Sequence, residues 1–315
     1  MAAIRTKSLT KRFGDVVAVR DVSLTVEEGE IFGFLGPNGA GKSTTINMLL
    51  DFMRPSEGTA EVLGHDAQQE PRTIRNRIGI LPEGYELYDR LTAREHLEFA
   101  IGAKNADERP MDLISRVGLM QEDADRKVGG YSKGMKQRLA LASALVGDPD
   151  LLILDEPSSG LDPHGIAEMR ELIRTEADQG TAVFFSSHIL SEVEAVCDRV
   201  GIMNDGRLVA ENTVEGLRNL SGTSSQLLLA VERVPSELNL TSIGGVSDVS
   251  IEDTTLRVSF SDPGKKARVV KRVDAATNIT DIESEEASLE ELFTSYTRGD
   301  ESADEASEAP AEVSA

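Results

Sequence analysis

The chain has a single cysteine, Cys197, and only four histidines among its 315 residues. One cysteine excludes an internal disulfide and any metal site built from several thiolates. The histidines are scattered without the spacing that zinc ligands adopt, so a zinc site is not expected. Cys197 lies in a helical pattern beside Val193 and Val196, and we expect it to serve in packing.

Long apolar runs are also missing. The longest, such as residues 151–154, are far shorter than the ~20 residues that a helix needs to cross a membrane. Four basic side chains near the N-terminus are not followed by an apolar stretch of signal-peptide length. We therefore expect a cytoplasmic protein, for which any work at the inner face of the cell membrane requires a membrane-embedded partner.

Basic residues are few compared with acidic ones. The 33 Lys and Arg against 55 Asp and Glu give a formal charge of -22, which opposes binding to nucleic acid or to anionic lipid. The acidic residues extend along the whole chain, and such a surface stays hydrated where salt screens its self-repulsion. The pattern fits a halophilic cytoplasm, and it also fits an ordinary acidic protein with an acidic tail.

Along most of the chain, short apolar strands alternate with helical stretches, the order of a mostly parallel α/β sheet. Residues 31–35, 151–154 and 182–185 are apolar without alternation, as in strands buried on both faces. The first of these runs leads into a glycine-rich loop and a helix predicted over residues 42–53. We place this first domain at residues 1–222.

A polar linker at residues 221–225 separates this part from a smaller one. Alternating segments such as residues 226–231 predict a small α+β domain over residues 225–298, which closes with a helix at 288–293. Residues 299–315 are mainly Glu, Asp, Ala and Ser without apolar periodicity. We expect them to form an acidic disordered tail.

The glycine-rich loop reads GPNGAGKS and matches the phosphate-loop pattern G-x-x-x-x-G-K-[ST] in full, between a predicted strand and a predicted helix. Its glycines let the backbone turn N–H groups toward an anion, and the helix start adds partial positive charge. The lysine can reach the β- and γ-phosphates of ATP, and the serine hydroxyl can ligate Mg²⁺. The predicted ATP contacts are Gly36, Pro37, Asn38, Gly39, Ala40, Gly41, Lys42, Ser43 and Thr44.

Two carboxylates follow the buried strand at residues 151–154. Asp155 is predicted to hold Mg²⁺ through water, together with Ser43. Glu156 is predicted to point the other way along the pleat, toward an attacking water, as the catalytic carboxylate. On their own the two acids also fit a strand capped before a turn, but with Lys42 upstream we favour the catalytic interpretation.

A segment that begins at Tyr131 resembles LSGGQ, the signature motif of ATP-binding cassette (ABC) ATPases. Ser132 and Gly134 are retained. The replaced positions are Tyr131, Lys133 and Met135. Ser132 is also predicted to cap a helix, whose free N–H groups offer a second anion site. In the family this site faces the γ-phosphate held by another protomer, so the resemblance implies a homodimer with two sandwiched ATP molecules.

Further elements of that family follow in order along the chain. Residues 159–162, SGLD, resemble its D-loop and imply that Asp162 lies at the nucleotide. His188 resembles its switch histidine, which hydrogen-bonds the γ-phosphate and supports catalysis, although a lone histidine after a strand is often structural. Phe13 aligns with the aromatic residue that stacks on adenine, although an isolated phenylalanine is often a core residue.

The family usually has a glutamine midway between the phosphate loop and the signature, but this chain has Glu83. A glutamate there can approach Mg²⁺ with its charge, or it can serve only in the interface. Thr92 and Glu95 follow at capping-box spacing. They predict the start of a helix in the region through which members of the family contact their membrane partner.

The resemblance covers about residues 3–220 and implies a P-loop NTPase with a RecA-like α/β core, an antiparallel β subdomain and a helical subdomain. It implies ATP and Mg²⁺ as cofactors, and a second copy of the chain and an integral-membrane permease as partners. Residues 131–138, Glu83 after Leu-Pro and the segment at 288–293 together resemble the branch paired with ABC-2-type permeases, commonly exporters. For the C-terminal domain we expect packing or dimer stabilisation.

Two alternatives belong to other classes. A soluble cassette ATPase of DNA repair or translation usually has a second cassette, a long coiled coil or basic elements, and none of these is evident in the sequence. A non-enzymatic regulator would use the nucleotide only as a switch, yet the chain has Asp155, Glu156 and His188. We therefore favour an ATP-hydrolysing transporter subunit.

Overall fold

The structure is a computed structural model that describes residues 1–220, 225–235 and 238–285. The predicted helix at 288–293 and the predicted tail at 299–315 lie outside these residues. The chain divides into two units, one of residues Met1–Val214 and one that begins at Glu215. Each unit is described by itself.

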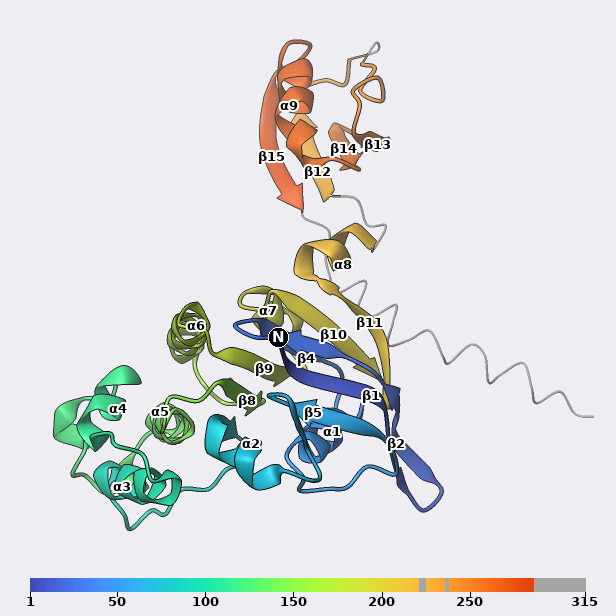
Figure 1. Ribbon diagram of the computed structural model, residues 1–315. Helices are drawn as coiled ribbons and strands as arrows, with labels where there is room; N and C mark the ends of the chain where they lie inside the picture. Colours follow the sequence, from blue (N-terminus) through green and yellow to red (C-terminus); the bar gives the residue numbers. More distant parts are fainter. Residues whose placement is uncertain (221–224, 236–237, 286–315) are drawn as a thin grey trace, which may run out of the picture. The chain divides into compact units, whose positions relative to one another are not determined.

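The centre of the first unit is a six-stranded sheet with the strand order β11-β10-β4-β9-β8-β7 (Figure 1). All neighbouring strands are parallel except β11, which pairs antiparallel with β10. Three of its strands are buried at every position, which confirms the predicted strands with two covered faces. The strands are β4 (Ile31–Leu35), β7 (Ile78–Leu81), β8 (Leu151–Asp155), β9 (Ala182–Ser187), β10 (Arg199–Asn204) and β11 (Arg207–Thr213).

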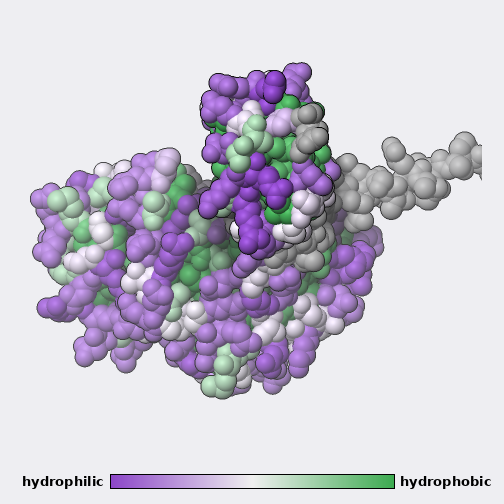
Figure 2. Space-filling model, turned by 90° about the horizontal axis from the view of Figure 1, so that it is seen from above, coloured by the Kyte–Doolittle hydropathy of each residue, from purple (hydrophilic) through white to green (hydrophobic). Residues whose placement is uncertain are grey.

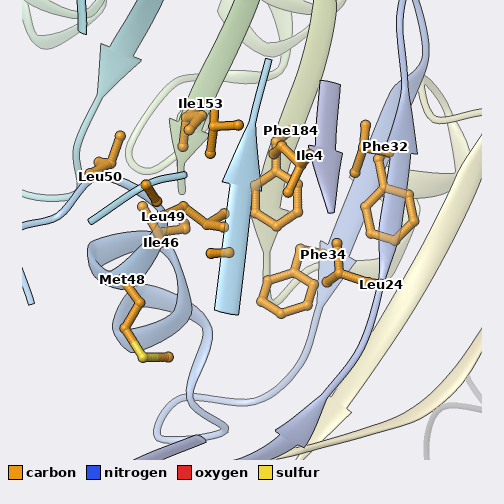
Figure 3. Close-up of a cluster of buried hydrophobic side chains, with 14 of the residues drawn as sticks. Ile4, Leu24, Phe32, Phe34, Ile46, Met48, Leu49, Leu50, Ile153 and Phe184 are labelled. Atoms are coloured by element: carbon orange, nitrogen blue, oxygen red, sulfur yellow. The ribbon is translucent and has the colours of Figure 1, made fainter. Parts of the chain in front are cut away.

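A second, antiparallel sheet has the order β2-β1-β5-β6, with β3 paired to β1. Its strands are β1 (Ala2–Phe13), β2 (Val16–Val22), β3 (Thr25–Glu27), β5 (Glu57–Val62) and β6 (His65–Asp66). The buried core joins side chains of both sheets to those of helix α1 (Lys42–Leu49). Figure 3 shows Ile4 and Leu24 of the antiparallel part near Phe34 and Phe184 of the parallel sheet.

Three helices, α3 (Ala93–Lys104), α4 (Pro110–Arg116) and α5 (Lys133–Ala144), pack against one another beside the parallel sheet (Figure 1). They agree with the expected helical subdomain. The 3₁₀ turns Gln121–Asp123 and Val128–Gly130 connect α4 to α5. The other helices of this unit are α2 (Pro71–Arg77), α6 (Pro163–Asp178) and α7 (Leu190–Glu194).

The helix starts follow from local side-chain chemistry. Thr92 and Glu95 form the predicted capping box at the start of α3, with both of its hydrogen bonds present. Ser132 caps α5 as predicted, since its hydroxyl accepts a hydrogen bond from the N–H of Met135. Helix α3 ends where Asn105 adopts a left-handed backbone conformation with φ 53°.

The predicted extent of the first helix is wrong at its C-terminal end. Helix α1 ends at Leu49 and does not continue to Met53. Asp51 has a left-handed φ of 53°, and the N–H groups of Phe52 and Met53 both donate to the carbonyl of Asn47. Such a left-handed residue closes a helix by turning the chain back over its last carbonyls.

The signature helix α5 lies directly against strand β7. A Cβ atom at Gly79 would lie 2.1 Å from the carbonyl oxygen of Ala144, the last residue of α5, and 2.6 Å from a methyl of Leu152. Only glycine fits this close approach of helix and strand. The contact fixes the distance of α5 from the sheet that carries the predicted catalytic residues.

The second unit has an antiparallel sheet with the order β13-β14-β12-β15. Helix α9 (Lys266–Asp274) buries Val269 and Val273 in a core shared with these strands. This arrangement confirms the predicted α+β class. Its strands are β12 (Ser225–Val231), β13 (Val246–Glu252), β14 (Thr255–Phe260) and β15 (Ile279–Glu285), with α8 (Val214–Leu220) before them.

The face shown in Figure 2 is mostly hydrophilic, with smaller groups of apolar side chains between polar ones. This agrees with the excess of acidic residues in the sequence. Within the described ranges, no helix is both long and apolar enough to span a bilayer.

Candidate functional site

The phosphate loop connects β4 to α1. Gly39 and Gly41 have φ values of 86° and 101°, a region that residues with a side chain rarely adopt. Gly41 is the N-cap of α1 and makes no side-chain cap, so the first N–H groups of the helix keep their capacity to bind an anion. A Cβ at Gly36 would lie 2.6 Å from the carbonyl of Met203, and backbone packing therefore also requires glycine there.

The remaining loop positions are placed as follows. Pro37 and Asn38 lie at the partly exposed start of the loop, and Ala40 is buried. Ser43 and Thr44 are half-buried in the first turn of α1, after Lys42. The loop therefore presents backbone N–H groups, one ammonium and two hydroxyls at a single helix start, the donors that a triphosphate requires.

Lys42 turns back over its own loop. Its Nζ donates to the carbonyls of Gly36 at 2.6 Å and Pro37 at 3.3 Å. The same Nζ lies 3.5 Å from Oε1 of Glu156, and the two side chains are only 6% and 8% exposed. A buried ammonium beside a buried carboxylate forms a compensated pair of charges at the end of the parallel sheet.

Glu156 also contacts His188. Its Oε2 lies 2.8 Å from Nδ1 of the histidine, which is 46% exposed. The prediction that strand pleating aims this carboxylate is wrong, because β8 ends at Asp155 and Glu156 has a left-handed φ of 50°. The N–H of Glu156 donates to both the carbonyl and the hydroxyl of Ser186, which hold the turn.

Asp155 is buried at the end of β8 and is held by the neighbouring strand. The hydroxyl of Ser186 donates to Oδ1 of Asp155 at 2.5 Å and accepts from the N–H of Glu156 at 3.1 Å. One serine thus fixes the positions of both predicted acids. No sequence pattern indicates this role, because Ser186 reaches the pair only through the pairing of β8 with β9.

Glu192 is a second residue that sequence reasoning did not identify. Its buried Oε2 accepts from the hydroxyls of Ser158 at 2.5 Å and Ser187 at 2.9 Å. It thereby joins the segment after Glu156 to the residue before His188. A glutamate four positions after a histidine carries no specific pattern, so only the structure reveals this connection.

Two residues of the predicted nucleotide site act as helix caps in the single chain. Ser132 is exposed at the start of α5, and Gly134 lies in the first turn of that helix. Asp162 caps α6, because its Oδ1 accepts from the N–H of Gly165 at 2.8 Å. Capping uses one lone pair of each oxygen, and further acceptor capacity remains.

Glu83 lies with Asp155 and Glu156, the two predicted acids, around one cavity of about 490 Å³. The cavity is lined by Glu83, Tyr85, Lys133, Gln137, Asp155 and Glu156, among others. Phe13 lies elsewhere, at the end of β1, with its ring 48% exposed and Nζ of Lys11 5.2 Å from the ring centroid. Among the described residues, the hydrogen bonds and ion pairs of Lys42, Glu156 and His188 do not include Phe13, Ser132 or Asp162.

Comparison with known proteins gives a consistent result. Residues 19–159 match the family described as ABC transporter. The bacitracin transport ATP-binding protein BcrA of Bacillus licheniformis is 37% identical over 304 residues, which cover 94% of this chain and 97% of that protein. The chain belongs to the ATP-binding proteins of ABC transporters. The daunorubicin/doxorubicin resistance ATP-binding protein DrrA of Streptomyces peucetius is 35% identical over 319 residues, 97% of this chain and 96% of the relative.

Solved structures agree with this ABC ATP-binding protein in fold. An ATP-binding subunit of an ABC transporter superposes with a TM-score of 0.64 at 32% identity, over 70% of this chain and 93% of the other. A dimeric ATP-binding cassette in a post-hydrolysis state with ADP and Pi gives a TM-score of 0.62 at 25% identity, over 67% and 98%. The predicted P-loop fold, the ATPase activity and the transporter role are confirmed, and the repair or translation alternative is not supported.

Proposed function

We propose that this ABC ATP-binding protein is the energy-supplying subunit of an ABC-2-type exporter, and that two copies close around two ATP molecules to drive a separate permease. The similarity to a bacitracin transport ATP-binding protein and a daunorubicin/doxorubicin resistance ATP-binding protein over nearly their full lengths supports the export role. The contact of Glu156 with both Lys42 and His188 carries the catalytic part of the proposal.

The loop of Gly36 to Gly41 would surround the β-phosphate with backbone N–H groups, and Lys42 would reach the β- and γ-phosphates. Ser43 and Asp155 fit Mg²⁺, because both offer hard oxygen donors and Asp155 is held by Ser186. Within the described part of the chain, no group of three or more acidic, His or Cys side chains forms a metal site by itself. Mg²⁺, which commonly takes few protein ligands, would supply charge neutralisation at the phosphates.

Glu156 would orient the attacking water and take up its proton as the water oxygen bonds to the γ-phosphorus and the bond to the β,γ-bridging oxygen breaks. His188 contacts Glu156 through Nδ1, which leaves Nε2 for an oxygen of the γ-phosphate. The half-exposed ring can thereby sense both the carboxylate and the nucleotide.

The second copy of the chain would complete each site. Ser132, which is exposed, and Gly134 in the first turn of α5 would face the γ-phosphate held by the other copy, where the helix start favours an anion. Phe13 is exposed enough to stack on adenine, and Asp162 would lie at the same interface.

A membrane permease would contact the region from Glu83 to Glu98. Tyr88 in this region is 72% exposed, and Phe99, directly after it, is 75% exposed. Exposed aromatic residues are typical anchors of protein interfaces. The subunit would then lie on the cytoplasmic side of the membrane through its permease.

Substitution of Glu156→Gln tests the catalytic proposal. We expect ATP binding to persist, turnover to fall by about 100-fold or more, and an ATP-dependent dimer to accumulate in size-exclusion chromatography. Glu171→Gln, on the exposed surface of α6, is the matched control and should keep wild-type turnover. Wild-type turnover of a folded Glu156→Gln protein would overturn the role of Glu156.

A further inference from the structure

Tyr85 and Gln137 are joined by a hydrogen bond, and both line the cavity that also contains Asp155 and Glu156. Tyr85 lies in the loop that follows β7, and Gln137 lies on α5, three residues after Gly134. The tyrosine hydroxyl donates to Oε1 of Gln137 at 2.6 Å. Burial raises the pKa of Tyr85 to about 12, so the hydroxyl keeps its proton at neutral pH.

The NH₂ end of the Gln137 amide also makes a hydrogen bond. Nε2 of Gln137 donates to the carbonyl oxygen of Pro157, and the glutamine side chain is almost completely buried. A proline carbonyl can only accept a hydrogen bond, so it requires the NH₂ end of the amide. The Oε1 end must then face Tyr85, which must donate. The three groups therefore have one consistent arrangement of donors and acceptors.

Pro157 directly follows Glu156, whose left-handed backbone places the carboxylate between Lys42 and His188. The turn is held on one side by the bonds from the N–H of Glu156 to Ser186. The bond from Gln137 holds it on the other side, at the carbonyl of the next residue. A shift of this carbonyl would displace Pro157, and with it the adjoining backbone of Glu156 from which the carboxylate extends.

We propose that Gln137 is a positioning residue for ATP hydrolysis, and that with Tyr85 it forms a bridge from the loop after β7 to the turn that holds Glu156. The inference rests on the proposed catalytic role of Glu156. Gln137 does not touch the reacting atoms. It fixes the carbonyl of Pro157, and Tyr85 fixes the amide of Gln137 in the only orientation that can do so.

A double-mutant cycle on the full-length protein tests the bridge. Gln137→Leu removes both hydrogen bonds at similar volume and should lower kcat by about tenfold or more, since small displacements of a catalytic group are costly. Tyr85→Phe removes one hydroxyl and should lower kcat by a smaller factor. The double variant should match Gln137→Leu alone, and KM for ATP should stay within about twofold in all three.

Gln68→Leu is the matched control, because Nε2 of Gln68 also donates to a backbone carbonyl, that of Met48, away from the catalytic acids. It should keep wild-type kcat even if the protein is less stable. Additive effects of the two substitutions, an effect on KM alone, or wild-type kcat in Gln137→Leu would overturn the bridge. If Glu156→Gln is inactive while Gln137→Leu is not, only the bridge fails; if Glu156→Gln is active, the proposed function fails first.

Discussion

Oε2 of Glu156 lies 2.8 Å from Nδ1 of His188, although 32 positions separate the two residues in the sequence. The contact exists because β8 and β9 are parallel neighbours, with Asp155 opposite Ser186. Both residues leave the sheet at its carboxyl edge, where ligands of parallel α/β sheets bind. The sheet pairing, together with the left-handed turn at Glu156, brings a carboxylate and an imidazole together.

Removing the imidazole of His188 should lower the rate of ATP hydrolysis much more than the affinity for ATP. His188→Ala should lower kcat by about 100-fold, because Glu156 loses its partner and the γ-phosphate loses a donor. ATP affinity, measured by fluorescent nucleotide titration, should change much less. His164→Ala, an exposed histidine on α6, is the control and should behave like the wild type. Equal losses in kcat for both variants would contradict the role of His188.

The ion pair between Arg116 and the buried carboxylate of Glu176 should help to hold α4 to α6. Arg116 of α4 donates to both carboxylate oxygens of Glu176 on α6, at 2.9 and 2.6 Å, and this carboxylate is 2% exposed. Arg116→Met leaves a buried charge without its partner and should cost about 3 kcal/mol in the free energy of unfolding, measured by urea denaturation.

Two further variants check this explanation. Replacing both partners, in Arg116→Met with Glu176→Met, should recover much of the loss, because no charge is then buried alone. Arg109→Met breaks an exposed pair with Asp112 and should leave the unfolding free energy nearly unchanged. A double variant as unstable as Arg116→Met alone would show that packing, and not charge, accounts for the loss.

Two glycine substitutions should change the free energy of unfolding in opposite directions. Gly79→Ala would place a methyl 2.1 Å from the carbonyl oxygen of Ala144, and overpacking of this kind costs about 1–3 kcal/mol or more. Gly102 lies in α3 with open space around its Cβ position, so Gly102→Ala should stabilise the protein by about 0.5–1 kcal/mol. Shifts of the urea midpoint in opposite directions are the expected result, and similar shifts would contradict the close packing of β7 on α5.

Glu211 should make stability depend on pH. Burial raises its pKa above the usual value of 4.5, against the opposing effect of Arg199. The unfolded chain therefore loses this proton first as pH rises, and the contribution of Glu211 to stability declines between pH 4.5 and the raised pKa. The glutamine of Glu211→Gln does not titrate. The unfolding free energy of the variant minus that of the wild type should therefore grow with pH across that window. A difference that does not change with pH would contradict the shift.

The sequence predicts the phosphate loop, the acids after β8 and the helix caps because each depends on residues close together in the chain. The carboxyl ends of parallel strands share one edge, so motifs that follow predicted strands can be placed near one another from the order of the strands. The end of α1 could not be predicted in the same way, because the hydrophobic pattern continues to Met53 while Asp51 turns the chain.

The supporting side chains were beyond sequence reasoning. Gln137 meets Tyr85 across 52 positions, and Glu192 meets Ser158 across 34. Such contacts depend on how α5, α7 and the loops pack on the sheet, and no local spacing encodes that packing. The roles of Phe13, Ser132 and Asp162 at a second copy of the chain stay predictions for the same reason, because one chain alone does not contain that interface.

The burial of Cys197 has a practical consequence. A Cβ at Gly33 would lie 2.9 Å from its sulfur, and burial raises the pKa of the thiol, which makes it a poor nucleophile toward alkylating reagents at neutral pH. The natural chain is therefore a ready background for site-directed labelling. A cysteine introduced on the surface, as in His164→Cys, would carry a fluorophore or spin label alone, and distances between two labelled copies would report directly on the approach of the subunits during the ATP cycle.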